Sequence, residues 1–92
     1  MGTMEEFIDY LKVNRRYSPR TQILYREYIG ELYEFVAPDS EEDFLSSLKP
    51  NIIRGFIAQG LDSGLSPRTM NLKLSAISSY CSYLMRKELI DS

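Results

Sequence analysis

The sequence of 92 residues contains no histidine and only one cysteine, Cys81. Histidine is the most frequent general acid or base in catalytic sites, so its absence removes the simplest route to proton transfer. The sequence also lacks metal-ligand spacings, a glycine-rich phosphate loop and a Ser/His/Asp set. A single cysteine cannot form an internal disulfide, which fits the reducing cytoplasm, where we expect the protein to act. These absences predict a chain with no catalytic residues, no metal and no cofactor.

Long apolar runs are missing too, so no membrane-spanning segment and no membrane partner are expected. The first residues are acidic where a secretory signal would be basic. Glu6 stands where myristoylation requires serine or threonine. We expect residues 1–3 to be a cloning remnant and residues 4–92 to form one domain, because a chain of this size buries only about two thirds of its unfolded surface.

Neither sign of charge is in large excess, because 11 Lys and Arg residues stand against 13 Asp and Glu residues, a net charge of −2. This total argues against a strong nucleic-acid binder. The distribution is uneven, with five basic residues and no acid between Lys12 and Arg26. Between Glu27 and Leu48 there are seven acidic residues and no basic one. This asymmetry is compatible with one basic face on an otherwise acidic domain.

Sustained alternation of apolar and polar residues is absent, so no strand is expected. Apolar residues recur instead at the three- and four-residue spacing of helices. The sequence therefore predicts an all-α fold, a small bundle of four main helices. The expected helices cover residues 4–13, residues 18–36, the segment from about Pro50 to the Asp-Ser-Gly-Leu turn, and Ser66 to about Lys87. Pro38 interrupts the pattern, and Gly64 is expected to close the third helix in a left-handed conformation.

Each expected helix has one apolar face that we assign to the core. Cys81 lies on such a face and is predicted to be a packing residue, because free cysteine behaves as a small hydrophobe. The inward residues of the last helix are Met70, Leu74, Ile77, Cys81 and Leu84. Those of the earlier helices are Phe7, Ile8, Tyr10 and Leu11, then Tyr25, Tyr28, Ile29, Leu32, Phe35 and Val36, then Ile53, Phe56 and Ile57.

The tetrapeptide Ser-Pro-Arg-Thr occurs twice, at residues 18–21 and 66–69. Serine is a good N-cap and proline is tolerated at the first helical position, so each copy predicts a helix start. Arginine in the first turn opposes the helix dipole, and capping alone does not require Arg-Thr. An anion bound at the helix N-terminus would reverse that cost, because exposed N–H groups, the arginine and the hydroxyls would all favour negative charge. A pure capping role and an anion-binding role are both open at this point.

The last expected helix also has a polar face opposite Ile77. Small hydroxyl residues on this face are framed by arginines, an arrangement that suits close approach to a phosphate backbone. The alternatives are an ordinary solvated face or a flat surface for another helix. The face comprises Arg68, Asn71, Leu72, Ser75, Ser78, Ser79, Ser82 and Arg86, of which Leu72 is the outward apolar residue.

Two stretches carry a resemblance to a known family, "FIDYLKVNRRYSPRTQILYREYIGELYEF" and "IIRGFIAQGLDSGLSPRTMNLKLSAISSYCSYLMRKELI". Their most specific parts are Ser-Pro-Arg-Thr at residues 18–21 with Tyr25, and Thr69, Asn71 and Leu74-Ser75-Ala76. With their spacing, they resemble the N-terminal core-binding (SAM-like) domain of tyrosine recombinases, the phage integrase family that includes Xer-like enzymes.

The resemblance implies a helical bundle that closes over one face of duplex DNA, while a separate C-terminal domain closes the other face and carries the chemistry. It places Arg20, Thr21, Arg26, Arg68, Thr69 and Asn71 at the DNA. Ser66 at the helix start, with Ser75, Ser78 and Ser79 on the polar face, completes the predicted DNA-binding set. The family often has arginine where this chain has Leu72, Ser78 and Ser82, so we expect weak and mostly electrostatic binding.

We therefore interpret the chain as the DNA-binding domain of a site-specific tyrosine recombinase, without the catalytic domain. The expected partners are duplex DNA at a recombination site, the protein's own catalytic domain and other recombinase protomers. The tyrosines are expected to pack in the core rather than react. The alternative is a helical protein–protein interaction module whose serine-rich face and Leu72 dock a partner helix. A helix-turn-helix repressor is disfavoured, because no short pair of helices of that kind is visible.

Overall fold

A computed structural model describes residues 2–91, in which every regular element is a helix. The helices are α1 (Gly2–Val13), α2 (Pro19–Val36), α3 (Glu41–Ser46), α4 (Pro50–Asp62) and α5 (Pro67–Arg86). The all-α prediction and the four main helices are confirmed. Gly64 follows α4 with φ +100°, so the predicted left-handed residue is confirmed as well. Within this part of the chain, no helix combines the length and the apolar character that crossing a membrane would need.

Helix α3 is the element that the sequence reading missed. It has only six residues, and Ser40 caps it by accepting a hydrogen bond from the Asp43 N–H at 3.1 Å. Three acidic residues in its first turn favour the positive end of the helix dipole. A serine followed three residues later by an acid is a known start signal, so this helix could have been recognised. Its function in the fold is to place Phe44, which is fully buried.

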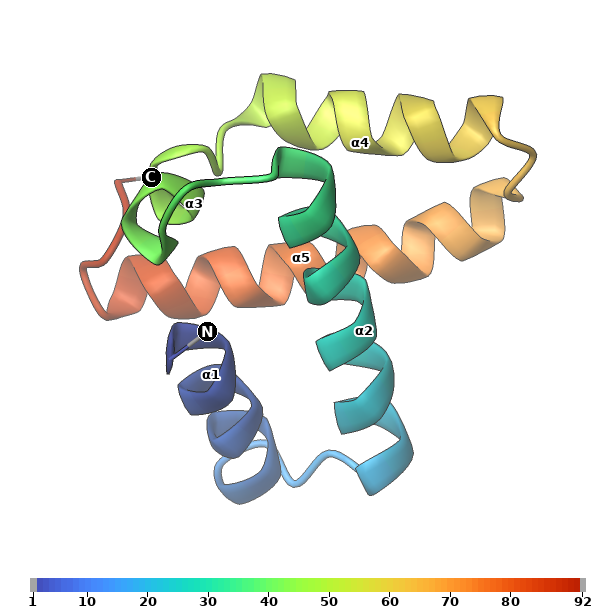
Figure 1. The fold of residues 1–92 in the computed structure, drawn as a ribbon. Helices are drawn as coiled ribbons and strands as arrows, with labels where there is room; N and C mark the ends of the chain where they lie inside the picture. The colour runs from blue at the N-terminus through green and yellow to red at the C-terminus, as the bar shows by residue number, and fades with distance from the viewer. Residues whose placement is uncertain (1, 92) are drawn as a thin grey trace.

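Helix α5, the longest at 20 residues, runs through the middle of the domain (Figure 1). In that view α4 lies above it, and α1 and α2 extend below it, with α2 crossing α5. Helix α2 packs against α5, α1 and α4, whereas α1 packs against α2 and α5. The crossing of α2 and α5 therefore organises the whole bundle, because each of the other two long helices packs against both of them.

The core is formed where α1, α2, α3 and α5 meet. Burying one large apolar side chain completely stabilises the fold by about 1.5–3 kcal/mol relative to leaving it exposed. Tyr80 joins two aromatic neighbours there, with ring centroids 5.2 Å from Phe7 and 6.4 Å from Phe44. The largest fully buried side chains are Tyr80, Phe7, Phe44, Leu11, Ile29, Leu32, Ile77 and Leu84.

The inward face of α5 differs partly from the sequence prediction. Met70, Ile77 and Leu84 are buried as expected, but Leu74 is 38% exposed, so its assignment to the core is wrong. Ala76 and Tyr83 are buried in its place. Helices α1, α2 and α4 all pack against α5, so the buried arc of α5 depends on where these three neighbours lie. Sequence periodicity gives the width of such an arc but not the direction from which neighbours arrive.

Two residues of α2 also depart from their expected place in the core. Tyr28 is only half-buried, and its ring lies 5.7 Å from the Lys73 ammonium group. Phe35 is 36% exposed and meets Phe56 of α4 edge to face at a centroid distance of 5.6 Å. Neither side chain belongs to the core, and Phe35 lines a hollow between α2, α4 and α5 instead.

The first residues of the chain contribute to packing between α1, α3 and α5. Thr3 donates from its N–H to Glu41 at 2.8 Å, and its hydroxyl bonds both Glu41 and Tyr80 at 2.7 Å. These hydrogen bonds lower the pKa of the Glu41 carboxyl, while burial raises the pKa of Tyr80 to about 12. The origin of residues 1–3 as a cloning remnant stays a prediction, and Met1 lies outside the described residues.

Cys81 is half-buried and packs against the core, and burial raises the pKa of its thiol. Because the thiolate is the reactive form, we expect slow labelling by a thiol reagent in buffer and fast labelling in denaturant. A matched control is the Cys81→Ala/Ser82→Cys variant, whose thiol would stand at an exposed position of the same helix. Equal labelling rates for the two folded proteins would show that the packing role of Cys81 is wrong.

Candidate nucleic-acid interface

Helices α2 and α5 begin in the same way, with an extended serine followed by proline in the first turn. The Ser18 hydroxyl oxygen accepts a hydrogen bond from the Thr21 N–H at 3.2 Å. The Ser66 hydroxyl oxygen accepts from the Thr69 N–H at 3.1 Å. Each bond satisfies one of the N–H groups that lack a partner at a helix start. The capping role of both serines is confirmed.

The threonines of the repeated tetrapeptide also take part in these caps. The hydroxyls of Ser18 and Thr21 lie 3.0 Å apart, and the Ser66 hydroxyl donates to the Thr69 hydroxyl at 3.0 Å. Threonine therefore has a structural reason to follow the capping serine by three positions. The sequence argument that capping leaves Arg-Thr unexplained is correct only for the arginine.

Replacing either capping serine by alanine is expected to lower the free energy of unfolding by about 1 kcal/mol. The exposed Ser75 in the interior of α5 provides the matched control. Ser75→Ala should stabilise the domain by a few tenths of a kcal/mol, because alanine is the better helix former. Urea unfolding of Ser18→Ala, Ser66→Ala and Ser75→Ala compares the three directly. A loss for Ser75→Ala as large as that for Ser66→Ala would contradict the capping role.

Arg20 and Arg68 point to solvent, and among residues 2–91 neither forms a salt bridge. Each opposes the positive end of its helix dipole without a compensating carboxylate. Figure 1 shows that α2 starts at the lower end of the domain, after the loop from α1, whereas α5 starts at the end that adjoins α4. The two arginines cannot share one small anion. They can meet different phosphates of one extended polyanion.

Arg26 is less free than the sequence suggested. Its guanidinium pairs with the Glu5 carboxylate of α1, and this hydrogen bond lowers the pKa of Glu5. Both side chains are about half exposed, so water screens the pair and it contributes little to stability. Arg26 can still turn toward a phosphate, but it must then give up its ion pair with Glu5. No local sequence pattern indicates this pairing, because Glu5 lies on another helix.

The polar face of α5 has the exposure that the sequence predicted. Asn71, Ser75 and Ser78 are exposed, Ser79 is half-buried and Leu72 is 52% exposed. Arg68 stands at the start of this face and Arg86 at its end. The structure therefore brings the predicted residues of α5 together on one accessible helix surface. Their contact with nucleic acid stays a prediction.

A hollow of about 220 Å³ where α1 packs on α5 is the feature that sequence reasoning missed. Arg86 donates from Nη2 to the Tyr10 hydroxyl at 2.8 Å there, and its guanidinium carbon lies 5.0 Å from the Tyr10 ring centroid. Arg15, in the loop after α1, also lines it. The packing of α1 on α5 creates this arrangement, so no sequence motif could have indicated it.

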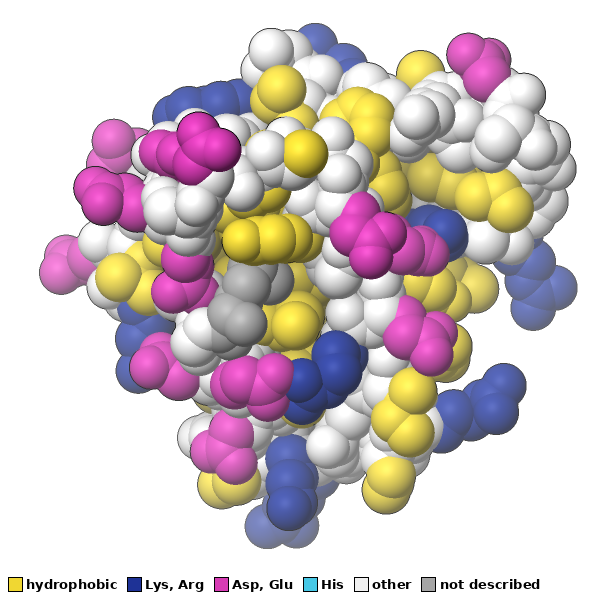
Figure 2. Space-filling model, in the orientation of Figure 1, with side chains coloured by type: hydrophobic (Ala, Val, Ile, Leu, Met, Phe, Trp, Pro, Cys, Tyr) yellow, Lys and Arg dark blue, Asp and Glu magenta, His cyan; other side chains and the backbone are white. Residues whose placement is uncertain are grey.

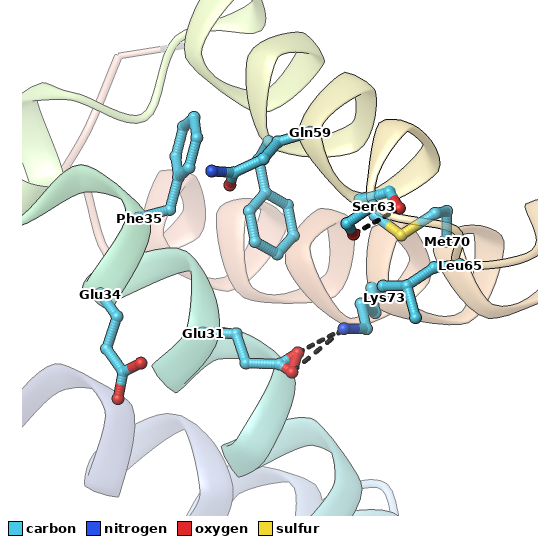
Figure 3. A pocket seen from close by; sticks show the side chains of 10 residues that line it. Glu31, Glu34, Phe35, Gln59, Ser63, Leu65, Met70 and Lys73 are labelled. Atoms are coloured by element: carbon cyan, nitrogen blue, oxygen red, sulfur yellow. Dashed lines mark hydrogen bonds and ion pairs between the residues drawn. The ribbon is translucent and has the colours of Figure 1, made fainter.

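A second hollow, of about 390 Å³, lies between α2, α4 and α5 (Figure 3). Lys73 points into it and donates to Glu31, with one Nζ–Oε2 distance of 3.0 Å. Glu34 and Phe35 line the same hollow. Because its single cation is already paired and a further carboxylate lies nearby, this hollow does not suit a phosphate.

Acidic side chains occupy much of the face shown in Figure 2, and the Lys and Arg side chains project mainly from its edges. Many like charges on one surface repel a polyanion, in proportion to how closely it approaches. This face is therefore a poor surface for nucleic acid. The basic residues at the helix starts and along α5 remain the better candidates.

Comparison with known proteins assigns the chain to a family. Residues 4–88 match the family model described as phage integrase, N-terminal SAM-like domain. The chain belongs to this family. It is 32% identical over 85 residues to tyrosine recombinase XerC of Bacillus subtilis (strain 168), a match that covers 92% of this chain and 28% of that protein. No solved structure matches the chain.

A second relative has the same printed name as the first. It is tyrosine recombinase XerC of Actinobacillus succinogenes, 26% identical over 87 residues that cover 95% of this chain and 29% of that protein. This SAM-like domain therefore spans less than a third of the curated relatives that it matches.

Most tyrosines of this SAM-like domain pack in the core or against it. Tyr80 and Tyr83 are buried, and the other five tyrosines are half-buried. Tyr25 stacks edge to face with Tyr17 at a centroid distance of 5.7 Å, and burial raises its pKa. A raised pKa keeps the phenol protonated, which is the opposite of nucleophile activation. The sequence prediction for Tyr25 and Tyr80 is therefore confirmed, whereas Tyr28 lies outside the core.

Proposed function

We propose that this SAM-like domain binds the backbone of duplex DNA and holds the DNA at a recombination site for a separate C-terminal catalytic domain of a tyrosine recombinase. The observation that carries the proposal is the pair of capped helix starts on crossing helices. Each presents an exposed arginine with no carboxylate partner among residues 2–91. Membership of the phage integrase family makes DNA the natural polyanion.

The residues on these elements suit positioning on the backbone more than reading of base sequence. Arginines, hydroxyls and N–H groups at helix starts are the usual phosphate contacts in protein–DNA complexes. Arg20, Thr21, Ser66, Arg68 and Thr69 belong to the helix starts, and Asn71, Ser75, Ser78 and Ser79 continue along α5. Arg26 joins them when it leaves Glu5. Few of these side chains can make two hydrogen bonds to one base edge, so we expect little sequence discrimination.

In the proposed function the catalytic domain carries out the chemistry. The SAM-like domain contributes no reacting group. Its partners are the duplex, that catalytic domain and other recombinase protomers on the same DNA. A cytoplasmic location goes with this proposed function, because we expect the DNA that the domain binds to lie there.

Duplex affinity measured across a salt series tests the proposal. If Arg20, Arg68 and Arg26 neutralise phosphates, they contribute about −2 to −3 to the slope of log affinity against log salt concentration, and every further phosphate contact makes the slope steeper. Raising salt from about 50 to 200 mM should then weaken binding at least about 10-fold. Fluorescence anisotropy with a short labelled duplex measures this slope.

An affinity that does not change with salt would contradict the DNA-binding proposal. Self-association or capture of a helical partner that is insensitive to salt would instead favour a protein–protein module. The exposed Leu72 on α5 is the residue that such a partner would cover. Leu72→Ala should weaken that association but leave duplex binding within about twofold, because Leu72 carries no charge.

A further inference from the structure

We propose that the hollow between α1 and α5 binds a phosphate group, and that this group is a phosphodiester of the DNA backbone. The hollow has a volume of about 220 Å³. Its polar lining consists of Tyr10, Arg15, Ser78, Ser79, Ser82 and Arg86. The source of the phosphate rests on the proposed function, but the affinity of the hollow for phosphate follows from its own side chains.

Neither cation of the hollow forms a salt bridge with another described residue. Among residues 2–91 the salt bridges are Arg26 with Glu5 and Lys73 with Glu31, so neither Arg15 nor Arg86 forms one. Two guanidinium groups that line one hollow repel each other. A phosphate between them removes that repulsion and accepts hydrogen bonds from both, which is the geometry that guanidinium groups favour.

Tyr10 holds one of these cations in place without neutralising it. Arg86 donates to the Tyr10 hydroxyl at 2.8 Å. This hydrogen bond lowers the pKa of Tyr10, and Arg15 acts in the same direction, so both cations raise the local positive potential. Helix α1 also carries the carboxylates of Glu6 and Asp9. They line a different hollow together with Tyr10 and Lys87. Neither carboxylate lines the hollow between α1 and α5.

The floor of the hollow supplies hydroxyl groups on a short and regular spacing. Ser78, Ser79 and Ser82 lie within one turn of α5, so they face the same side of the helix. Serine hydroxyls donate to phosphate oxygens, and their small size lets the backbone of a duplex approach α5 closely. Ser78 and Ser82 are exposed, as are Arg15 and Arg86, so an external phosphate can reach the hollow.

The hollow in Figure 3 has the opposite charge pattern to the hollow between α1 and α5. There the single lysine is already paired with Glu31, and Glu34 adds another negative charge. Between α1 and α5 the charges are reversed, with two cations and no carboxylate lining the hollow.

Salt-dependent duplex binding of the Arg15→Ala/Arg86→Ala double variant tests the proposal. The slope of log affinity against log salt should become shallower by about 2, because about one counterion is released for each phosphate contact. The matched control is Arg54→Ala, an exposed arginine on α4, which packs with α2 and α5 but not with α1. That control should keep the wild-type slope.

A second variant covers the case in which the double variant unfolds. Ser82→Asp places a carboxylate at an exposed position in the hollow and should weaken duplex binding at least as much as Arg86→Ala does. In parallel, inorganic phosphate is titrated into the isotope-labelled wild-type chain. Shifts of the Ser78, Ser79 and Ser82 amide resonances should appear, and the double variant should lose them.

The outcomes separate the two proposals. If the double variant and Ser82→Asp both bound the duplex with the wild-type salt slope, that result would overturn the proposal of a phosphate site in the hollow and leave the proposed function standing. Phosphate binding at the hollow without any duplex binding would support the phosphate chemistry, identify free phosphate as its source and overturn the proposed function. Absence of both would overturn both.

Discussion

Tyr80→Ala is expected to lower the free energy of unfolding by about 3–5 kcal/mol, a large share of the stability of a small domain. Tyr80 is fully buried at the junction of α1, α3 and α5. Its ring lies 5.2 Å from that of Phe7 and 6.4 Å from that of Phe44. Truncation would leave a cavity in contact with both neighbours. Urea unfolding followed by circular dichroism measures the loss.

The companion variant Tyr80→Phe separates the ring from the hydroxyl. It keeps the aromatic packing and removes only the hydrogen bond to Thr3 at 2.7 Å. We expect a loss of about 1 kcal/mol, since Thr3 keeps its bonds to Glu41. If Tyr80→Ala and Tyr80→Phe were equally destabilising, the ring would not be at the centre of the core, and this account of the fold would be wrong.

The Arg20→Ala/Arg68→Ala double variant is expected to lose most of its duplex affinity. Two phosphate contacts contribute a slope of about −1.8, and this electrostatic contribution vanishes near 1 M salt. Extrapolation from that point gives a loss of about 200-fold at 50 mM salt and about 20-fold at 200 mM. Salt-titrated anisotropy of the wild type and the double variant over the same range measures both values.

The same double variant should be as stable as the wild type, or slightly more stable. Arg20 and Arg68 oppose their helix dipoles and have no carboxylate partner among residues 2–91, so their removal costs the fold nothing. Thermal melts of the double variant and of Arg54→Ala provide the control. A clear loss of stability together with unchanged binding would make the arginines structural. The repeated tetrapeptide would then be a helix start and nothing more.

Much of the fold was predictable, because its long helices carry their start signals in the sequence. Ser18 and Ser66, each followed by proline, mark the starts of α2 and α5, and both caps are formed. The rotation of α5 was not predictable in the same way. Leu74 is exposed and Tyr83 is buried, because the positions of the helices packed against α5 decide which side of it is covered.

Gly60 of α4 shows how a residue of one helix can be adapted to a side chain of the next. The Met70 side chain of α5 packs so closely on Gly60 that any Cβ there would overlap its sulfur atom. The glycine therefore lets α4 and α5 approach each other just before and after the turn that joins them. Helix propensity describes one helix at a time and cannot reveal a requirement imposed by the next.

The candidate site likewise contains residues that could be grouped from the sequence and residues that could not. Residues that follow one another on α5, such as Ser75 and Ser78, could be grouped from the sequence because a helix places them on one face. The pairing of Arg26 with Glu5 and the placement of Arg15 and Arg86 in one hollow could not, because in each case the two residues come from segments far apart in the sequence. Tertiary packing brought these charges together, and no local pattern records it.

The separation of the two helix starts has a mechanical consequence. A duplex attached at one point can swivel about that point, whereas attachment at two distant points fixes its angle to the protein. The frame that holds Arg20 and Arg68 apart is the packing of α2 against α5, and each of these helices contributes fully buried side chains to the core, such as Ile29 and Ile77. A conservative change in the interior could therefore tilt a bound duplex without altering any residue that touches it.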